Sequence, residues 1–184
     1  MAILEIIGLK NPLLRQRSRP VLRFDDKLQQ LIDNMIETMR HKQGVGLAAP
    51  QVNIPWRLAV IETPPLVDED GKEIENSREL YVVVNPEIVW TSRRTLDGME
   101  ACLSIPGYVG EVNRYEAVRV RGQDRYGRKA TWRIEDWTAR IFQHEIDHLN
   151  GVLYIDRLTT PDSFWTEEEF REKFGDQEDK PAAD

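Results

Sequence analysis

Apolar residues recur every three or four positions between residues 25 and 44, and this period predicts a helix with one face in the core. Asp25 or Asp26 is expected to cap its start, and Gly44 is expected to end it. Residues 1–24 have no helical period and contain two prolines, so we expect an irregular, extended arm on the surface. The apolar stripe of the helix consists of Leu28, Leu31, Ile32, Met35, Ile36 and Met39.

Shorter apolar runs follow this helix and predict strands, because turn-forming residues separate them. Asn85-Pro86 lies between two of these runs, and the proline indicates an edge, a bulge or a break. Residues 111–125 alternate, turn at residues 124–127 and return through residues 129–134, which predicts a β-hairpin. The other predicted strands cover residues 57–61, 80–84, 87–91 and 152–155.

A second helical period appears in the C-terminal third of the chain. On a helical wheel, His144, Glu145 and His148 share one arc with Trp137 and Ile141. A helix of this kind is buried on most sides and carries its polar chemistry on one face. A second, apolar arc consists of Ala139, Phe142, Ile146 and Leu149. The expected boundary residues are Asp136 at the N-cap and Gly151 just past the last turn.

The tail predicts one more short helix. Thr166 and Glu169 have the spacing of a capping box, and Trp165 and Phe170 occupy the positions of a hydrophobic staple. The order of all elements predicts an α+β fold, a single domain with largely antiparallel sheets around the buried helix. The expected division is residues 1–160 for the main domain and residues 161–184 for a short C-terminal helix and acidic tail.

Composition narrows the class of protein. A chain of 184 residues, with 40% hydrophobic and 31% charged residues, is typical of one soluble globular domain. We expect a cytoplasmic protein without a membrane segment, because no apolar run could span a bilayer and no signal-peptide pattern is present. The single cysteine, Cys102, fits a reducing compartment. The net charge of −7 gives no electrostatic case for specific nucleic-acid binding.

The strongest chemical signal is the pattern His-Glu-x-x-His at residues 144–148. Residues i and i+4 lie nearly above one another on a helix, so two imidazoles can share one metal ion while Glu145 reaches a water on it. The pattern also arises by chance on charged surface helices. Here, however, two of only three histidines occupy it among apolar neighbours. A third ligand elsewhere in the chain would decide between these interpretations.

Two other stretches are unusual. Residues 44–51 combine two glycines with small residues, which lets the backbone approach a ligand or another strand closely. They do not form a nucleotide-binding loop, since no Gly-Lys-Ser/Thr follows. Residues 97–107 contain Cys102. A lone cysteine is most often a small buried hydrophobic residue, so its importance depends on its neighbours.

Three blocks together closely resemble the peptide deformylases. They are Gly-Val-Gly-Leu-Ala-Ala-Pro-Gln at 44–51, Glu-Ala-Cys-Leu-Ser at 100–104 and Gln-His-Glu-Ile-Asp-His at 143–148. The resemblance covers about residues 3–158. One departure is Ala101, where the family usually has glycine, and its methyl group could narrow the groove for the substrate backbone.

The resemblance implies a metal-dependent hydrolase that removes the N-terminal formyl group from N-formylmethionine of newly synthesised polypeptides and releases formate. It implies Cys102, as thiolate, beside His144 and His148 as metal ligands, with an open fourth position for water. Glu145 would move the proton of that water. The remaining implied residues are Gln51 and Leu103 at the oxyanion, and Val45, Gly46, Ala101 and Ile141 along the peptide. Glu100 and Asp147 could orient the imidazoles or simply form ion pairs, with Arg114 available as a partner.

The resemblance also implies a cofactor and partners. The cofactor is one divalent metal ion, typically Fe²⁺, which Ni²⁺, Co²⁺ or Zn²⁺ can replace. The ligand set suits several of these metals, so it does not choose among them. The implied partners are formylmethionyl ends of nascent chains and, transiently, the ribosome.

Two alternatives stay open at this stage. The first is a zinc peptidase, of which two classes are relevant. One class needs a third histidine at position 154, where this chain has Tyr154. Another takes a glutamate about twenty residues downstream, and Glu168 has that spacing. The second alternative is a metal-stabilised binding module without activity, although every residue needed for the chemistry is intact.

Overall fold

The computed structural model describes residues 2–75 and 77–175, and within them the predicted α+β fold is confirmed. This described part has three α-helices: α1 (Asp26–His41), α2 (Asp136–Leu149) and α3 (Glu167–Phe174). Its eight strands are β1 (Gly46–Ala48), β2 (Leu58–Glu62), β3 (Leu80–Thr91), β4 (Thr95–Cys102), β5 (Ile105–Tyr115), β6 (Ala117–Gln123), β7 (Lys129–Glu135) and β8 (Phe164–Thr166).

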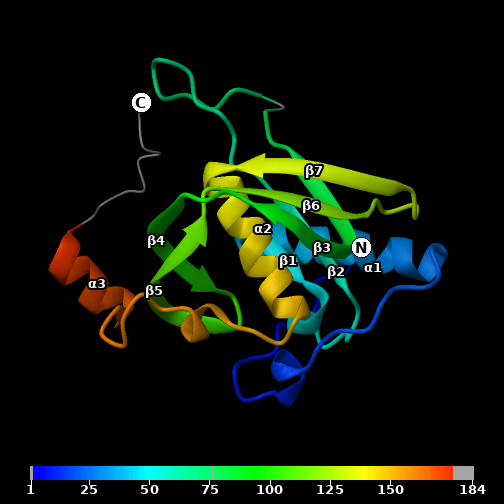
Figure 1. Cartoon of the computed structure of the whole chain (residues 1–184), viewed down its shortest axis with the longest axis horizontal. Helices are drawn as coiled ribbons and strands as arrows, with labels where there is room; N and C mark the ends of the chain where they lie inside the picture. Colours follow the sequence, from blue (N-terminus) through cyan, green and yellow to red (C-terminus); the bar gives the residue numbers. More distant parts are fainter. Residues whose placement is uncertain (1, 76, 176–184) are drawn as a thin grey trace.

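The strands form two antiparallel sheets with α2 between them (Figure 1). The larger sheet has the order β1-β2-β3-β6-β7, and the smaller has the order β4-β5-β8. Apolar side chains of α2, such as Phe142 and Leu149, pack with Val118 and Val120 of the larger sheet. The other side of α2 contacts β5 of the smaller sheet. This arrangement explains why every residue from Ala139 to Leu149 is buried.

The predicted first helix is confirmed, and it ends earlier than expected. Asp25 caps it, because its side chain accepts a hydrogen bond of 3.1 Å from the Leu28 N–H. The helix ends at His41, and a turn with φ of 54° at Gln43 precedes Gly44. The apolar stripe packs against β1, β2 and the N-terminal arm. That arm is irregular, as predicted, apart from the short 3-10 helix η1 (Pro12–Arg15).

Several strand boundaries differ from the prediction. The two runs separated by Asn85-Pro86 form the single strand β3, with a register shift between Val84 and Glu87, so the proline marks a bulge. The β6–β7 hairpin is confirmed, but the preceding run divides at Glu116 between the two sheets. The strand predicted at residues 152–155 is wrong, because the 3-10 helix η3 (Tyr154–Asp156) lies there.

The C-terminal end of α2 agrees with the prediction, but its N-terminal end does not. The N-cap is Glu135, and Asp136 is the first helical residue, with φ of 55°. Gly151 lies just past the helix with φ of 76°, as predicted. A Cβ atom at Gly151 would lie 2.6 Å from the backbone oxygen of Arg15, so this turn needs glycine to let the arm pass.

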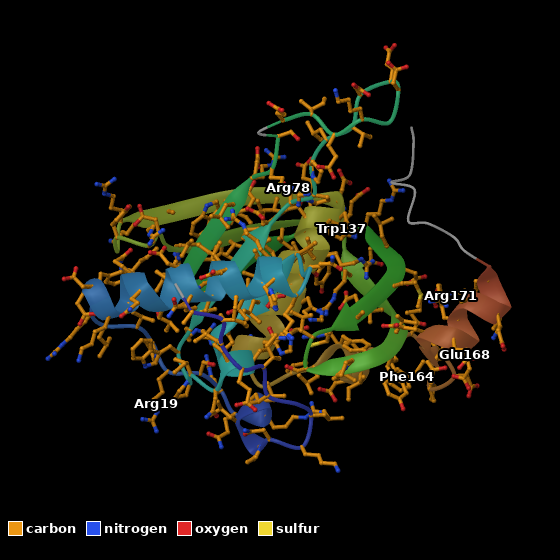
Figure 2. All side chains as sticks on the ribbon, turned by 180° about the vertical axis from the view of Figure 1, so that it is seen from behind. Arg19, Arg78, Trp137, Phe164, Glu168 and Arg171 are labelled. Carbon is orange, nitrogen blue, oxygen red and sulfur yellow. The ribbon has the colours of Figure 1, made fainter. Side chains whose placement is uncertain are left out.

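The C-terminal segment folds onto the smaller sheet. Strand β8 pairs with β5, and Figure 2 shows Phe164 and Glu168 together at one end of the molecule. The predicted capping box of α3 is confirmed, and the rings of Trp165 and Phe170 lie 6.1 Å apart, as a staple requires. The acidic tail at residues 176–184 lies outside the described residues. None of the described helices is long and apolar enough to cross a membrane.

Candidate metal centre

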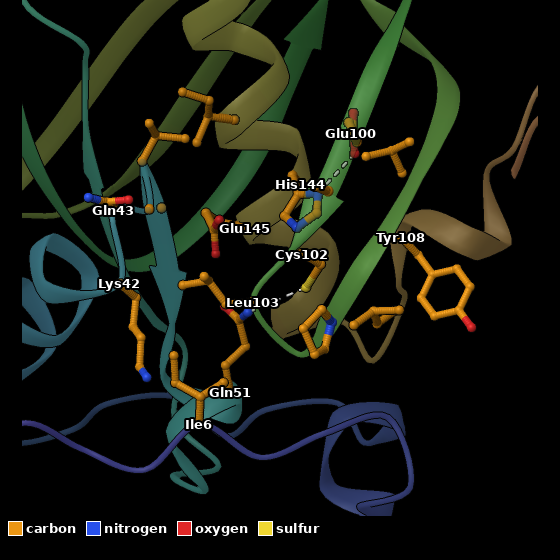
Figure 3. A pocket seen from close by; sticks show the side chains of 18 of the residues that line it. Ile6, Lys42, Gln43, Gln51, Glu100, Cys102, Leu103, Tyr108, His144 and Glu145 are labelled. Atoms are coloured by element: carbon orange, nitrogen blue, oxygen red, sulfur yellow. Dashed lines mark hydrogen bonds and ion pairs between the residues drawn. The ribbon is translucent and has the colours of Figure 1, made fainter. Parts of the chain in front are cut away.

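Polar side chains from β4, α2 and the stretch after β1 face one cavity of about 890 Å³ (Figure 3). Cys102 is the last residue of β4, where the pairing with β5 shifts register between Ala101 and Cys102. This shift places the sulfur toward α2. His144 and His148 are on successive turns of α2, so both imidazoles point the same way.

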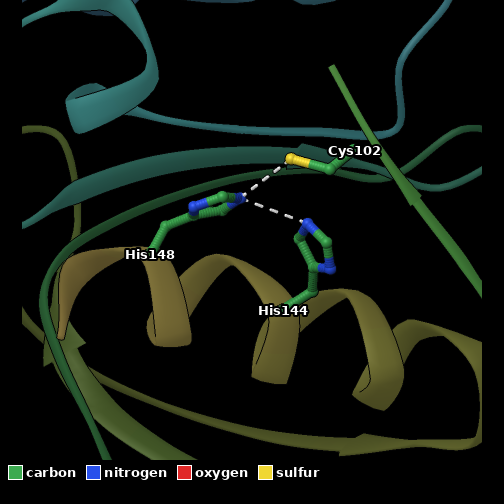
Figure 4. Close-up of side chains that lie close together, drawn as sticks. All are labelled: Cys102, His144 and His148. Carbon is green, nitrogen blue, oxygen red and sulfur yellow. Dashed lines mark hydrogen bonds between the residues drawn. The ribbon is translucent and has the colours of Figure 1, made fainter. Parts of the chain in front are cut away.

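The three predicted metal ligands meet at one point (Figure 4). Cys102 Sγ lies 3.3 Å from His148 Nε2, and that nitrogen lies 3.2 Å from His144 Nε2. Tetrahedral coordination with ordinary metal bond lengths requires separations of about 3.6 Å between S and N, and about 3.3 Å between two N atoms. The arrangement therefore fits a single metal ion almost without movement.

The charges of the ligands also fit a metal ion. Burial lowers the pKa of both histidines, but at His144 the hydrogen bonds to Cys102 and Glu100 outweigh burial and raise its pKa. At His148 burial dominates, and the charge of His144 lowers its pKa further. A metal ion would displace the proton that the raised pKa keeps on His144, since metals bind neutral imidazole and thiolate.

Glu100 orients His144. Its Oε2 lies 2.8 Å from His144 Nδ1, which leaves Nε2 toward the metal position. Arg114 donates two hydrogen bonds, of 2.8 and 2.9 Å, to the same carboxylate. Burial alone would raise the pKa of Glu100, but the hydrogen bonds from Arg114 and His144 hold it far below its usual range. Glu100 is therefore an anion that supports the ligand.

Asp147 has a different role from Glu100. It pairs with Arg114 at 2.5 Å and with Arg157, and no hydrogen bond joins it to an imidazole within the described residues. Of the two open interpretations, ion pairing holds for Asp147, whereas Glu100 combines ion pairing with orientation of His144. The Asp147–Arg114–Glu100 chain ties the C-terminal half of α2 to β4 and β5.

Glu145 lies at the cavity floor and is 3% exposed. Burial raises the pKa of its carboxyl to about 7. Its Oε2 has no hydrogen-bond partner among the described residues, so this oxygen is available to a substrate or a water. A buried carboxyl with a pKa near neutrality is suited to accept and return a proton.

Gly46 gives Glu145 its space. A Cβ atom at Gly46 would lie 2.2 Å from Glu145 Oε1 and 2.8 Å from its Cδ. Replacing Gly46 with alanine is expected to displace the carboxylate and lower kcat about 10²-fold or more, because positioning at this scale limits proton transfer.

The matched control for this change is Gly107→Ala. Gly107 also lines the cavity, and no atom lies within 4 Å of an added Cβ, although its φ of 80° makes any side chain mildly strained. Formate release and bound metal should be measured for both variants. Unchanged kcat in Gly46→Ala would show that Glu145 tolerates displacement.

Gln51 is held with its amide N–H toward the sulfur. Its Oε1 accepts a hydrogen bond of 2.8 Å from the Ala48 N–H, which fixes the amide orientation. Its Nε2 then lies 3.5 Å from Cys102 Sγ and 3.4 Å from Ser104 Oγ. Leu103, between these two residues, also lines the cavity. The two groups expected at the oxyanion thus lie beside the ligand cluster.

The four expected substrate residues all line the same cavity: Val45, Gly46, Ala101 and Ile141. The structure adds others that the sequence analysis missed. Trp137 lies on the arc of α2 that includes Ile141, so the wheel contained a signal for it. Tyr108 and Phe170 carried no such signal, because β5 and α3 reach the cavity only through the tertiary fold.

Neither position that a zinc peptidase would use supplies a third metal ligand to this cluster. Tyr154 is buried, and its hydroxyl donates to the Tyr108 carbonyl at 3.2 Å. Glu168 is exposed on α3. Among the described residues, the ligand atoms that cluster within 4.8 Å belong to Cys102, His144 and His148.

Comparisons with known proteins point to one family. Residues 3–164 match the family model described as polypeptide deformylase. The peptide deformylase of Symbiobacterium thermophilum is 47% identical over 159 residues, which is 86% of this chain and 68% of that protein. The crystal structure of the Thermotoga maritima peptide deformylase has a TM-score of 0.77 and 39% identity, and the match covers 87% of this chain and all of that one. An Acinetobacter baumannii peptide deformylase, solved with Met-Ala-Ser bound, has a TM-score of 0.75 and 34% identity over 85% of this chain and 99% of that one.

Proposed function

Because this chain belongs to the peptide deformylase family, we propose that Cys102, His144 and His148 hold one divalent metal ion for formyl hydrolysis. The activity is removal of the N-terminal formyl group from formylmethionine of newly synthesised polypeptides, with release of formate. The observation that supports these ligand roles is the convergence of the three ligand atoms beside Glu145 at the floor of the cavity.

The chain's own groups divide the work of the reaction. Cys102, His144 and His148 would hold the divalent metal ion, which would supply a water of lowered pKa and a Lewis acid for the formyl oxygen. Glu145 accepts the proton of the attacking water and later delivers it to the departing amine nitrogen. The Gln51 amide and the Leu103 backbone N–H donate to the formyl oxygen as negative charge develops on it. Burial of Glu145 and Gln51 keeps bulk water from competing for these hydrogen bonds.

The proposed substrate path runs along the cavity wall. Val45 and Gly46 offer a strand edge for the peptide backbone, and Ile141 forms part of the methionine pocket. The methyl group of Ala101 replaces the hydrogen of the family's usual glycine on the opposite wall, so it affects contacts with the substrate backbone and leaves the chemistry unchanged. The Met-Ala-Ser bound to the A. baumannii neighbour has the form of a deformylated peptide, which supports a methionyl peptide as the substrate class.

The test is formate release from formyl-Met-Ala-Ser by the metal-loaded protein. We expect turnover of the formylated peptide and none of the acetylated one, since the larger acetyl group is excluded near Glu145. Cleavage of internal peptide bonds without formate release would instead support a peptidase.

We also propose that the resident metal is Fe²⁺, with Ni²⁺, Co²⁺ or Zn²⁺ as working substitutes. Air should then inactivate the iron-loaded protein several times faster than the nickel-loaded one. Fe²⁺ is oxidised readily, and the Cys102 thiolate beside it enters the oxidation ladder. Activity decay in air should be compared for both forms, with mass spectrometry of the peptide that contains Cys102. Equal decay with unmodified Cys102 would favour zinc as the resident metal.

The division of the chain is a proposal as well. We assign the metal-dependent deformylase catalytic domain to residues 1–160, and a short C-terminal helix with an acidic tail to residues 161–184. The family match, which ends at residue 164, supports a boundary in this region. We further propose a cytoplasmic location and transient association with the ribosome, where formylated chain ends appear.

A further inference from the structure

The N-terminal arm has a charge opposite to that of the whole chain. Residues 6–24 contain five cations and no acidic residue, whereas the net charge of the protein is −7. The cations are Lys10, Arg15, Arg17, Arg19 and Arg23. The net charge therefore conceals a basic segment, and its position on the surface decides what it can bind.

The arm is attached to the body at two buried residues, and the residues on either side of them are exposed. The Ser18 N–H donates to the Leu149 carbonyl at 2.9 Å, and the Val21 N–H donates to Asn85 Oδ1 at 2.8 Å. Ser18 and Val21 are buried. In an extended segment neighbouring side chains point to opposite sides, so residues 17 and 19 project into solvent.

A tryptophan lies beside these arginines. The Arg19 N–H donates to the Pro55 carbonyl at 2.8 Å, and the Arg57 N–H donates back to Arg19 at 2.8 Å. Arg19 and Trp56 therefore form an isolated parallel β-bridge, which joins the backbone of the arm to the segment before β2. Trp56 is 37% exposed. A cation and a partly exposed indole are thus fixed next to each other.

Three of the four arginines in the arm have no anionic partner in the part of the chain that the structure describes. Arg15 pairs with Asp156, but no ion pair of Arg17, Arg19 or Arg23 is found within residues 2–75 and 77–175. The Arg57 guanidinium is already used within the protein: it donates to the Leu149 carbonyl at 3.1 Å, to Asn150 Oδ1 at 3.0 Å and to the Pro86 carbonyl at 2.9 Å.

Arg17 and Arg57 also repel each other. Burial lowers the pKa of Arg57, and the charge of Arg17 lowers it further. Glu87 acts in the opposite direction, but its carboxylate also pairs with Arg121 at 3.0 Å. An external anion would relieve this repulsion.

We propose that the arginine arm, defined as Arg17, Arg19 and Arg23 with Trp56, binds the phosphate backbone of RNA. Guanidinium groups bind phosphate through paired N–H donors, and an exposed indole stacks on an unpaired base. Such contacts read no sequence, so binding is weak, salt-dependent and non-specific. The choice of RNA over DNA or lipid rests on the proposed function, because the substrate is a chain leaving the ribosome, whose surface is largely RNA.

The arginine arm is separate from the catalytic cavity. None of its residues lines that cavity. Figure 2 shows Arg19 far from Phe164 and Glu168, which mark the end of the molecule where β8 and α3 lie. RNA on the arm therefore leaves the cavity open to a peptide.

The test measures binding of the full-length, metal-loaded protein to a fluorescein-labelled single-stranded RNA across a salt series. The variant combines Arg17→Gln, Arg19→Gln and Arg23→Gln. A matched control, Lys72→Gln, Arg78→Gln and Arg93→Gln, removes the same charge from exposed cations elsewhere; Arg78 lies far from Arg19 in Figure 2. We expect the arm variant to bind about tenfold or more weakly at low salt, and its log–log salt slope to fall by about two, while the control stays near wild type.

Three outcomes would overturn the proposal: no salt-dependent RNA binding by wild type, equal losses in both variants, or binding to phosphatidylserine vesicles in preference to RNA. The vesicle arm is needed because Leu22, next to Arg23, is 86% exposed and could insert into lipid. Turnover of formyl-Met-Ala-Ser is expected to be the same in both variants and wild type. RNA binding requires no turnover, so failure of the proposed function and failure of this proposal are seen in different measurements.

Discussion

Replacing Glu145 with glutamine is expected to lower kcat about 10²–10⁴-fold while the protein keeps its fold and its metal. Glutamine has nearly the shape of glutamate, so the contact with Gly46 is preserved, but an amide cannot accept and return a proton. Glu145 is next to His144 in sequence without belonging to the ligand cluster, so its loss leaves the three ligands in place. Formate release, metal content and thermal unfolding should be measured on one preparation.

The matched control is Glu167→Gln. Glu167 also lines the cavity, but it is exposed on α3, so the same change in charge there should leave kcat within about twofold of wild type. Near-normal activity of Glu145→Gln with full metal occupancy would remove Glu145 from the mechanism. A loss of metal in that variant would assign the residue to the ligand set.

Cys102→Ala is expected to abolish metal retention and, with it, formate release. The two remaining imidazoles lack the anionic sulfur. Removing a residue that only orients a metal ligand weakens metal binding by up to about 100-fold, so removing a ligand itself should weaken it by more than that. Cys102 is 5% exposed and small, so the lost packing alone should cost only about 1 kcal/mol, and any further loss of stability in the metal-loaded comparison is due to the missing metal. Metal analysis after dialysis and circular dichroism separate these two effects.

Glu168→Ala is the control that addresses the peptidase alternative. Because Glu168 is exposed on α3, its removal should change neither metal content nor turnover. If Glu168→Ala lost the metal and Cys102→Ala kept it, the assignment of the third ligand would be reversed.

Local periodicity was sufficient to predict the helices. The apolar stripe of α1 and the two arcs of α2 correspond to the buried sides of these helices. A helix side that is buried has apolar residues every three or four positions, and this period can be seen in the sequence. The predicted start of α2 is wrong by one residue, because Asp136 has a positive φ and this backbone conformation cannot be predicted from an aspartate. Asp is a good cap in general, but here Glu135 occupies that position.

The sheets were harder to predict, for a physical reason. The run from β5 to β6 alternates without interruption, because both sheets bury every second residue on either side of Glu116. The sequence therefore does not mark where the chain changes sheets. Strand β4 was missed because Gly98 faces the Arg140 guanidinium and Glu100 faces Arg114, so its inward positions are not apolar.

The spacing of His144 and His148 predicted two metal ligands on one face of a helix, but the third ligand came only from the motif resemblance. Nothing in the local sequence brings Cys102 to His144 and His148, since that depends on α2 lying between the two sheets. The ion pairs of Arg114 and the cavity residues Tyr108 and Phe170 are likewise tertiary. The motif resemblance predicted the three ligands, whereas the residues around them could be identified only from the structure.

The division of the ligands between β4 and α2 also bears on the unfolded chain. A metal ion held by Cys102 and His144 closes a loop that includes β5, β6 and β7, much as a disulfide would. By the chain-entropy relation for cross-links, closing a loop of this length removes about 3–5 kcal/mol of conformational freedom from the denatured ensemble. An ion held by the proposed ligands would therefore also be a reversible cross-link between the smaller sheet and the helix beneath the larger one. Its occupancy couples the supply of metal to the lifetime of the folded protein.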